Sequence, residues 1–178
     1  NISRLENGET HTSEDTLMAL SDALGFPPAF FKLPGHIMPS NLSYRKRQQV
    51  PVKLITPIEA QINIIRRHVQ FLSRTLHKSL PVLPLYAVDD NNTPAKIATL
   101  VRRKWGVSTP VIDNLIHLAE EQGILISHFD FGTERVDSRS ILTDDKYPVI
   151  FLNSTMQGDR QRFSLAYELG HLLLHTYT

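Results

Sequence analysis

The residues best suited to chemistry lie near the end of the sequence, where an apolar run contains Tyr167, Glu168, His171 and His175. Residues four apart share one face of a helix, so the Tyr and both His would form a stripe with Glu168 beside it. Zinc peptidases use the helical pattern His-Glu-x-x-His, in which two imidazoles hold the metal and the Glu takes a proton from metal-bound water. Here a phenol stands at the first imidazole position, and only Glu-x-x-His remains, a pattern too short to identify a metal site.

The phenol of Tyr167 changes the expected chemistry. A phenol with an ordinary pKa of about 10 must lose its proton to bind a metal well, whereas an imidazole is neutral at about pH 7. Without tightly held zinc the pKa of water stays at about 15.7, so we expect hydrolysis to be weak or absent. Two alternatives stay open: His171 and His175 bind a metal one turn later, or the helix simply packs an aromatic and a histidine against the core.

Capping signals predict four helices before this one. They start after Ser13, at Thr56-Pro57, at Thr93-Pro94 and at Thr109-Pro110, and Gly25 and Gly123 end the first and the last. Helical spacing predicts the residues that face the core. These are Leu17, Leu20 and Leu24; Ile58, Ile62, Ile65, Val69, Leu72, Leu76 and Leu80; Ile97, Leu100 and Val101; and Ile112, Leu115, Ile116 and Ala119.

Short apolar runs at 124–129 and 148–152 predict two strands, and the polar stretch 133–145 predicts a third strand or a loop. Gly158-Asp159 then starts the chemistry-bearing helix, from about residue 160 to 175. The expected fold class is therefore α+β, mostly helical, with a small sheet.

The run 162–175, Arg-Phe-Ser-Leu-Ala-Tyr-Glu-Leu-Gly-His-Leu-Leu-Leu-His, resembles the signature of the ImmA/IrrE metallopeptidase family, near Arg-Phe-Thr-Leu-Ala-His-Glu-Leu-Gly-His-Leu-x-x-His. Only Ser164 and Tyr167 depart from it. The segments 148–153 and 112–126 are similar to the family's preceding strand and helix-to-strand unit. The resemblance implies a zincin-like peptidase domain in which Glu168 is the general base and His171 the second zinc ligand, with Tyr167 at the first ligand's position. The third ligand, an acidic residue on a later helix, would follow residue 178. Zinc is the family's cofactor, and we expect it to be weakly held or absent here.

The first residues are similar to a second known module. Ser3 to Gly8, followed by the helix after Ser13, resembles the second half of a helix-turn-helix domain of the XRE, or Cro/repressor, type. The aromatic turn 25–31 resembles the end of such domains. Base-reading residues would precede Asn1. Ser3 and Arg4 are therefore expected to contact only DNA phosphates.

These likenesses predict three parts: residues 1–33, the carboxy-terminal part of a helix-turn-helix domain; 34–50, a linker with basic residues; and 51–178, a metallopeptidase-like domain that is incomplete at its end.

The composition excludes several classes of site and of protein. The 178 residues include 19 Lys and Arg, 18 Asp and Glu and no Cys, which excludes disulfides and cysteine-ligated metals. No run approaches the roughly 20 apolar residues of a membrane span, and the polar start is not a signal peptide. We expect a cytoplasmic protein without a membrane partner.

The leading hypothesis is a bacterial or phage-type transcriptional regulator whose metallopeptidase-like domain is catalytically impaired and senses or binds a ligand. Its partners would be DNA, through the complete helix-turn-helix domain, and a repressor protein, a peptide or a small molecule, with a homodimer as one arrangement. The alternatives are an active zinc peptidase that cleaves a repressor, and an antitoxin-like module that uses the helix 57–80 as a partner surface.

Overall fold

A computed structural model of the chain describes residues 2–6, 8–33, 45–46, 50–77 and 79–174. The chain divides into two compact units, Asn1–Met38 and Pro39–Thr178. His175, half of the alternative metal-binding pair, and most of the predicted linker lie outside the described residues.

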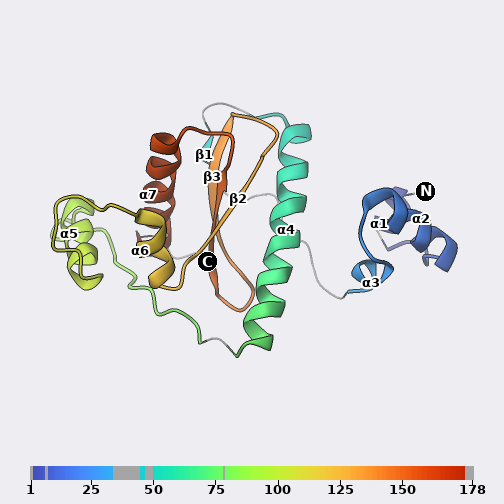
Figure 1. The fold of residues 1–178 in the computed structure, drawn as a ribbon, viewed down its shortest axis with the longest axis horizontal. Coiled ribbons are helices and arrows are strands. Elements are labelled where there is room, and N and C mark those ends of the chain that lie inside the picture. The colour runs from blue at the N-terminus through green and yellow to red at the C-terminus, as the bar shows by residue number, and fades with distance from the viewer. Residues whose placement is uncertain (1, 7, 34–44, 47–49, 78, 175–178) are drawn as a thin grey trace. The chain divides into compact units, whose positions relative to one another are not determined.

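The first unit consists of short helices, α1 (Ile2–Glu6), α2 (Glu14–Leu24) and α3 (Pro28–Phe31) (Figure 1). The helix predicted after Ser13 is confirmed, because its hydroxyl accepts a hydrogen bond from the Thr16 N–H at 3.2 Å. Gly25 ends it with a φ of 70°, a left-handed conformation that suits glycine. The predicted inner face is only partly right: Leu17 is buried, but Leu24 is 57% exposed, since no described neighbour in this small unit covers the end of α2.

A four-stranded sheet is the centre of the second unit. It contains β1 (Arg45–Lys46), β2 (Leu125–Phe129), β3 (Val136–Leu142) and β4 (Pro148–Asn153), in the spatial order β1-β3-β4-β2. β2 runs parallel to β4, and β3 runs antiparallel to it. Both predicted strands are confirmed, and the polar stretch between them contains a strand rather than only a loop.

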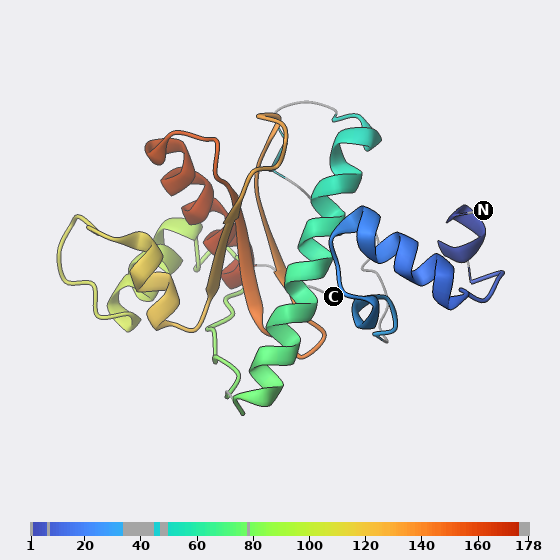
Figure 2. The same ribbon diagram turned by 45° about the vertical axis from the view of Figure 1, so that its right-hand side comes forward.

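Helices cover both faces of this sheet. α4 (Val52–Thr75) lies on one face, and α6 (Leu115–Glu121) and α7 (Gly158–Leu174) lie on the other (Figures 1 and 2). α5 (Pro94–Lys104) packs beside α7, where Ile97 and Val101 contact Leu173. The result is a mixed α and β structure, compatible with the predicted α+β class.

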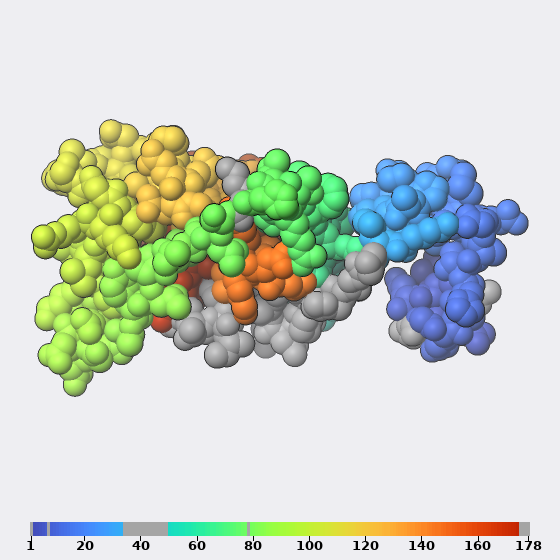
Figure 3. All heavy atoms as spheres, turned by 90° about the horizontal axis from the view of Figure 1, so that it is seen from below, coloured from blue at the N-terminus to red at the C-terminus, as the bar shows by residue number. Residues whose placement is uncertain are grey.

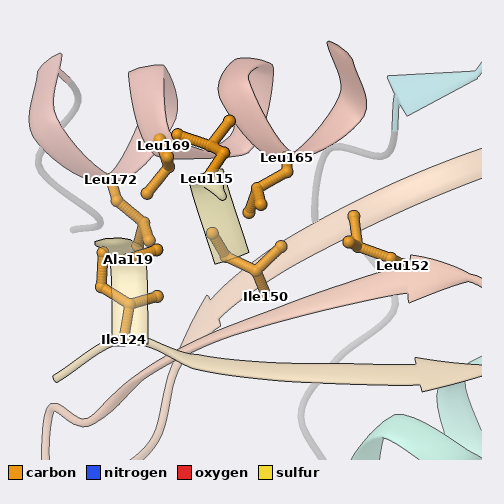
Figure 4. Close-up of a cluster of buried hydrophobic side chains, with 8 residues drawn as sticks. All are labelled: Leu115, Ala119, Ile124, Ile150, Leu152, Leu165, Leu169 and Leu172. Atoms are coloured by element: carbon orange, nitrogen blue, oxygen red, sulfur yellow. The ribbon is translucent and has the colours of Figure 1, made fainter. Parts of the chain in front are cut away.

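The main core lies between α6, α7 and the sheet. Figure 4 shows the leucines of α7 above Ile150 and Leu152 of β4. The segment after α4, green in Figure 3, runs over the surface of this unit towards α5. It is tied to α7 by a hydrogen bond from the Tyr86 N–H to the Leu173 carbonyl at 2.9 Å.

The long helix differs from its prediction at both ends. α4 begins at Val52, with Pro51 as its N-cap, and Pro57 lies inside it. Pro57 has no N–H to donate to the carbonyl one turn earlier, yet the helix continues across it. α4 ends at Thr75 rather than near residue 80, and His77 has a positive φ of 48°. Its predicted inner face is therefore right for its first half only, and the predicted core residues of its second half are wrong: Leu72, Leu76 and Leu80 are exposed.

The two shorter helices are also partly corrected. α5 starts after Thr93 as predicted, but Leu100 is exposed rather than buried. α6 starts after Asn114, not at Thr109-Pro110, because the Asn114 side chain accepts from the His117 N–H at 3.0 Å. The Thr109 hydroxyl instead donates to the Val111 carbonyl within a turn. Across the described ranges, no helix is both long and apolar enough to cross a membrane.

Candidate functional site

Glu168, the predicted general base, lies on the face of α7 that meets the sheet. Its carboxylate is bound by two hydroxyls of β3: Ser138 Oγ donates to Oε1 at 2.8 Å and Ser140 Oγ donates to Oε2 at 2.6 Å. Glu168 is only 3% exposed, and both serines are buried. Each carboxylate oxygen thus accepts a short hydrogen bond of the charge-assisted type.

The register of the sheet explains why both serines reach one carboxylate. Residues two apart on a strand point to the same face, so Ser138 and Ser140 share a side of β3. They pair with Leu152 and Ile150 of β4, which pack under α7. The small serine side chains leave room above β3 for the longer glutamate side chain. We define these three residues, Ser138, Ser140 and Glu168, as the serine-carboxylate cluster.

Tyr167 and His171 lie together on another face of α7, as their spacing predicts. Their ring centroids are 4.6 Å apart with an interplanar angle of 80°, an edge-to-face contact. Tyr167 is 44% exposed and His171 is partly buried. The phenol therefore makes an edge-to-face contact with the histidine at the position where the family signature has its first imidazole.

The donor groups of this site do not fit a zinc ion of the His-Glu-x-x-His type. A phenol replaces one imidazole, and it must be deprotonated before it binds a metal well. In that pattern Glu168 would be the general base rather than a ligand, and its carboxylate is already bound to Ser138 and Ser140. Within the described part of the chain, no three His, Cys, Asp or Glu residues are grouped so that they could hold a metal.

Further polar contacts fix β3 relative to α7. Arg160, in the first turn of α7, donates from Nε to Asp137 Oδ2 at 3.1 Å, and Asp137 is buried. Hydrogen bonding to Asp137 raises the pKa of Arg160 above its ordinary value. At the end of β4, the Asn153 amide donates to the carbonyls of Thr133 and Val136 at 2.8 and 3.0 Å. These contacts hold the serines of β3 beneath α7.

Sequence reasoning missed both serines of the cluster. The one signal available was the spacing of Ser138 and Ser140 in a polar segment, which would place them on one face if that segment were a strand. Glu168 is 30 and 28 residues away from them in the sequence, so no local pattern reveals their contact.

The two residues predicted to contact phosphate are exposed neighbours on α1. Arg4 Nε donates to Glu9 Oε2 at 3.3 Å, and Ser3 precedes it on the surface. Gly8 has a φ of 70° and its N–H donates to the Leu5 carbonyl at 3.0 Å, as expected of a glycine that ends a helix. The structure thus places Ser3 and Arg4 together, within reach of solvent.

Comparison with known proteins bears on the second unit. Residues 119–178 match the family model described as the IrrE N-terminal-like domain. The match supports the ImmA/IrrE family for this part of the chain. It includes β2, β3, β4 and α7, so the whole serine-carboxylate cluster lies within the matched residues. Neither the curated proteins nor the solved structures include a match to this chain.

Proposed function

We propose that the chain is part of a transcriptional regulator in which a DNA-binding helix-turn-helix head is joined to an ImmA/IrrE-type domain that has lost catalysis and acts as a sensor or interaction domain. The observation that carries this proposal is the serine-carboxylate cluster.

A general base must lie within hydrogen-bonding reach of the water that it deprotonates. The carboxylate of Glu168 is buried, and both of its oxygens accept hydrogen bonds from the protein. Tyr167 stands where the first imidazole of a zinc site would be needed. The Glu168 carboxylate and the residue at the first ligand position are thus both unsuited to peptide hydrolysis. This supports a structural role for Glu168.

The regulator part of the proposal has support from the first unit. α1 ends at Glu6, Gly8 follows with a φ of 70°, and α2 comes next with its N-cap at Ser13 and its C-cap at Gly25. The sequence resemblance assigns this arrangement to the second half of an XRE-type domain. Ser3 and Arg4 would then contact the DNA backbone, whose phosphates position a protein without specifying sequence.

An active zinc peptidase is the second candidate function, because Glu168 and His171 are retained in an otherwise well-matched signature. Zinc content and peptide cleavage decide between the two. We expect the purified full-length protein to contain far less than one zinc per chain by elemental analysis and to leave candidate repressor proteins intact. Stoichiometric zinc, together with cleavage that Glu168→Gln abolishes, would overturn the proposal.

The first ligand position is tested by Tyr167→His. This change adds the missing imidazole and should raise zinc affinity without producing cleavage, since Glu168 stays bound to its serines. Phe163→His is the matched control, because it places an imidazole one turn earlier on the same helix, at another exposed aromatic position. It should leave zinc affinity unchanged.

The DNA-binding role is tested by capture of genomic fragments with the full-length protein. We expect a defined set of fragments to be enriched. Arg4→Ala should weaken binding to all of them and should reduce the slope of log affinity against log salt concentration by about one. Arg135→Ala, which removes an exposed cation of the other unit, is the control. Recovery of random fragments would contradict a sequence-specific regulator.

A further inference from the structure

A third face of α7, away from both the serine-carboxylate cluster and the Tyr167–His171 pair, borders a pocket. α5, α6 and α7 together line a pocket of about 370 Å³. This volume lies within the range of roughly 300–1,000 Å³ that is typical of small-molecule sites. The lining is almost entirely apolar and includes Trp105, Leu118 and Leu169, while Arg102 is the one charged residue among the described residues that line it.

Small residues of α7 form one side of the pocket. Ala166 and Gly170 are one helical turn apart, and both line it. A Cβ added at Gly170 would meet no atom within 4 Å apart from its own helix neighbourhood, so the glycine borders open space. The pocket therefore owes part of its volume to a missing side chain rather than to poor packing of large ones.

Arg102 is held in place by the loop that follows α5. Its Nη2 group donates to the carbonyls of Thr109 and Pro110, the latter at 3.0 Å. Within the described part of the chain, the N–H groups on Nη1 and Nε donate to no acceptor. An arginine side chain carries five N–H donors in a planar fork that matches a carboxylate. The guanidinium is thus fixed through one nitrogen and keeps donors for a ligand.

We propose that this pocket binds a small amphipathic carboxylate, whose apolar chain lies between α5, α6 and α7 and whose carboxylate binds Arg102. The apolar walls favour burial of a hydrocarbon chain, and a single guanidinium complements a single negative charge. This proposal names a ligand class for the sensor role proposed above, and its biological meaning rests on that role. α7 would connect the two features, because the pocket and Glu168 lie on different faces of the same helix.

Decanoate is the probe, and binding is measured on the full-length protein by isothermal titration calorimetry and by the fluorescence of Trp105, which lines the pocket. We expect saturable binding below the concentration at which decanoate forms micelles, with a change in Trp105 emission. Arg102→Gln should weaken decanoate binding by about tenfold to a hundredfold, the effect of losing a hydrogen bond to a charged group. It should leave the affinity for decan-1-ol within about threefold of the wild-type value, because the alcohol carries no charge.

Two further variants separate the pocket from the surface. Gly170→Leu fills the open space and should abolish binding of both probes while the protein stays folded, since the helix readily accepts leucine. Arg103→Gln removes the adjacent exposed cation, which does not line the pocket, and should leave decanoate affinity unchanged.

Several results would overturn the proposal. Equal loss of decanoate affinity in Arg103→Gln and Arg102→Gln would indicate nonspecific attraction by the positive charges of α5. Unchanged binding in Gly170→Leu would place the probe elsewhere. A wild-type dimer that Gly170→Leu converts to a monomer would assign the pocket to a second copy of the chain. None of these readouts depends on DNA binding or cleavage, so failure here is distinguishable from failure of the proposed function.

Discussion

Removing the hydroxyls that bind Glu168 should destabilise the second unit markedly. Ser140→Ala removes a 2.6 Å hydrogen bond to a carboxylate that is 3% exposed. A hydrogen bond to a charged group contributes about 1.5–3 kcal/mol, and a buried acceptor that is left unsatisfied costs its full desolvation penalty. We therefore expect Ser138→Ala and Ser140→Ala each to lower the free energy of unfolding by about 1.5–3 kcal/mol.

The double variant should lose about 3–5 kcal/mol, the usual cost of leaving a buried charge without its partners. The two losses need not add, because both serines bind the same side chain. Adding Glu168→Met to the double variant should restore most of the lost stability, since replacing all partners by apolar groups of similar size can be nearly neutral. Such a rescue would show that the double variant is destabilised by the unpaired carboxylate rather than by the loss of two small side chains.

Urea unfolding followed by tryptophan fluorescence provides the assay. Trp105 is the sequence's only tryptophan and packs against the main core, so its emission reports on the second unit rather than the first. Exposed Ser154→Ala is a suitable control and should change stability by less than about 0.5 kcal/mol. The reasoning is refuted if the serine variants unfold at the same urea concentration as the wild type. It is also refuted if Glu168→Ala has a higher free energy of unfolding than the wild type, because that result is expected of a residue kept for catalysis at the expense of stability.

Other substitutions test two glycines and one ion pair elsewhere in the second unit. Gly123→Ala should destabilise by more than about 1 kcal/mol, because Gly123 has a φ of 81° and an added Cβ would lie 2.6 Å from Pro81 Cβ; thermal unfolding measures this loss. Gly170→Ala should instead stabilise α7 by up to about 1 kcal/mol, since its Cβ meets open space in a helix, and an unchanged or lower Tm would contradict this. The hydrogen bond from Arg74 lowers the pKa of Asp145 below its ordinary value of 3.8, so their pair stabilises the protein above that pH and the benefit is lost as the pH falls through the lowered pKa. Arg74→Met should therefore be less stable than the wild type at neutral pH but equal to it in acid, as urea unfolding at both pH values would show.

Local capping chemistry predicted some helix starts and failed at others, for a physical reason. Thr-Pro occurs at residues 56, 93 and 109, and only Thr93 caps a helix, with its hydroxyl accepting from the Lys96 N–H. Proline fits both the first turn of a helix and a turn in a loop, so the dipeptide alone does not distinguish them. At Thr56 the preceding residues extend the helix, and at Thr109 the chain turns instead.

The candidate site was predictable in its residue types but not in its contacts. The motif identified Glu168, Tyr167 and His171, and helical periodicity correctly placed the last two side by side. The orientation of Glu168 towards Ser138 depends on the register of β3 with β4, which is set by pairing between distant segments. Apolar periodicity also overestimated burial along the long helix, because α4 ends at Thr75, and Leu72 in its last turn and Leu76 and Leu80 after it are exposed.

Three faces of α7 make different contacts. One face buries Leu165 and Leu169 with Glu168 against the sheet, so the glutamate of the motif contributes to packing. A second face carries Tyr167 and His171 in edge-to-face contact, and a third borders the apolar pocket at Gly170. A single change at Tyr167 would alter only the second face, and the carboxylate would stay bound to β3. If the domain has lost catalysis as proposed, that loss would involve two separate structural features, and restoring the imidazole would reverse only one of them.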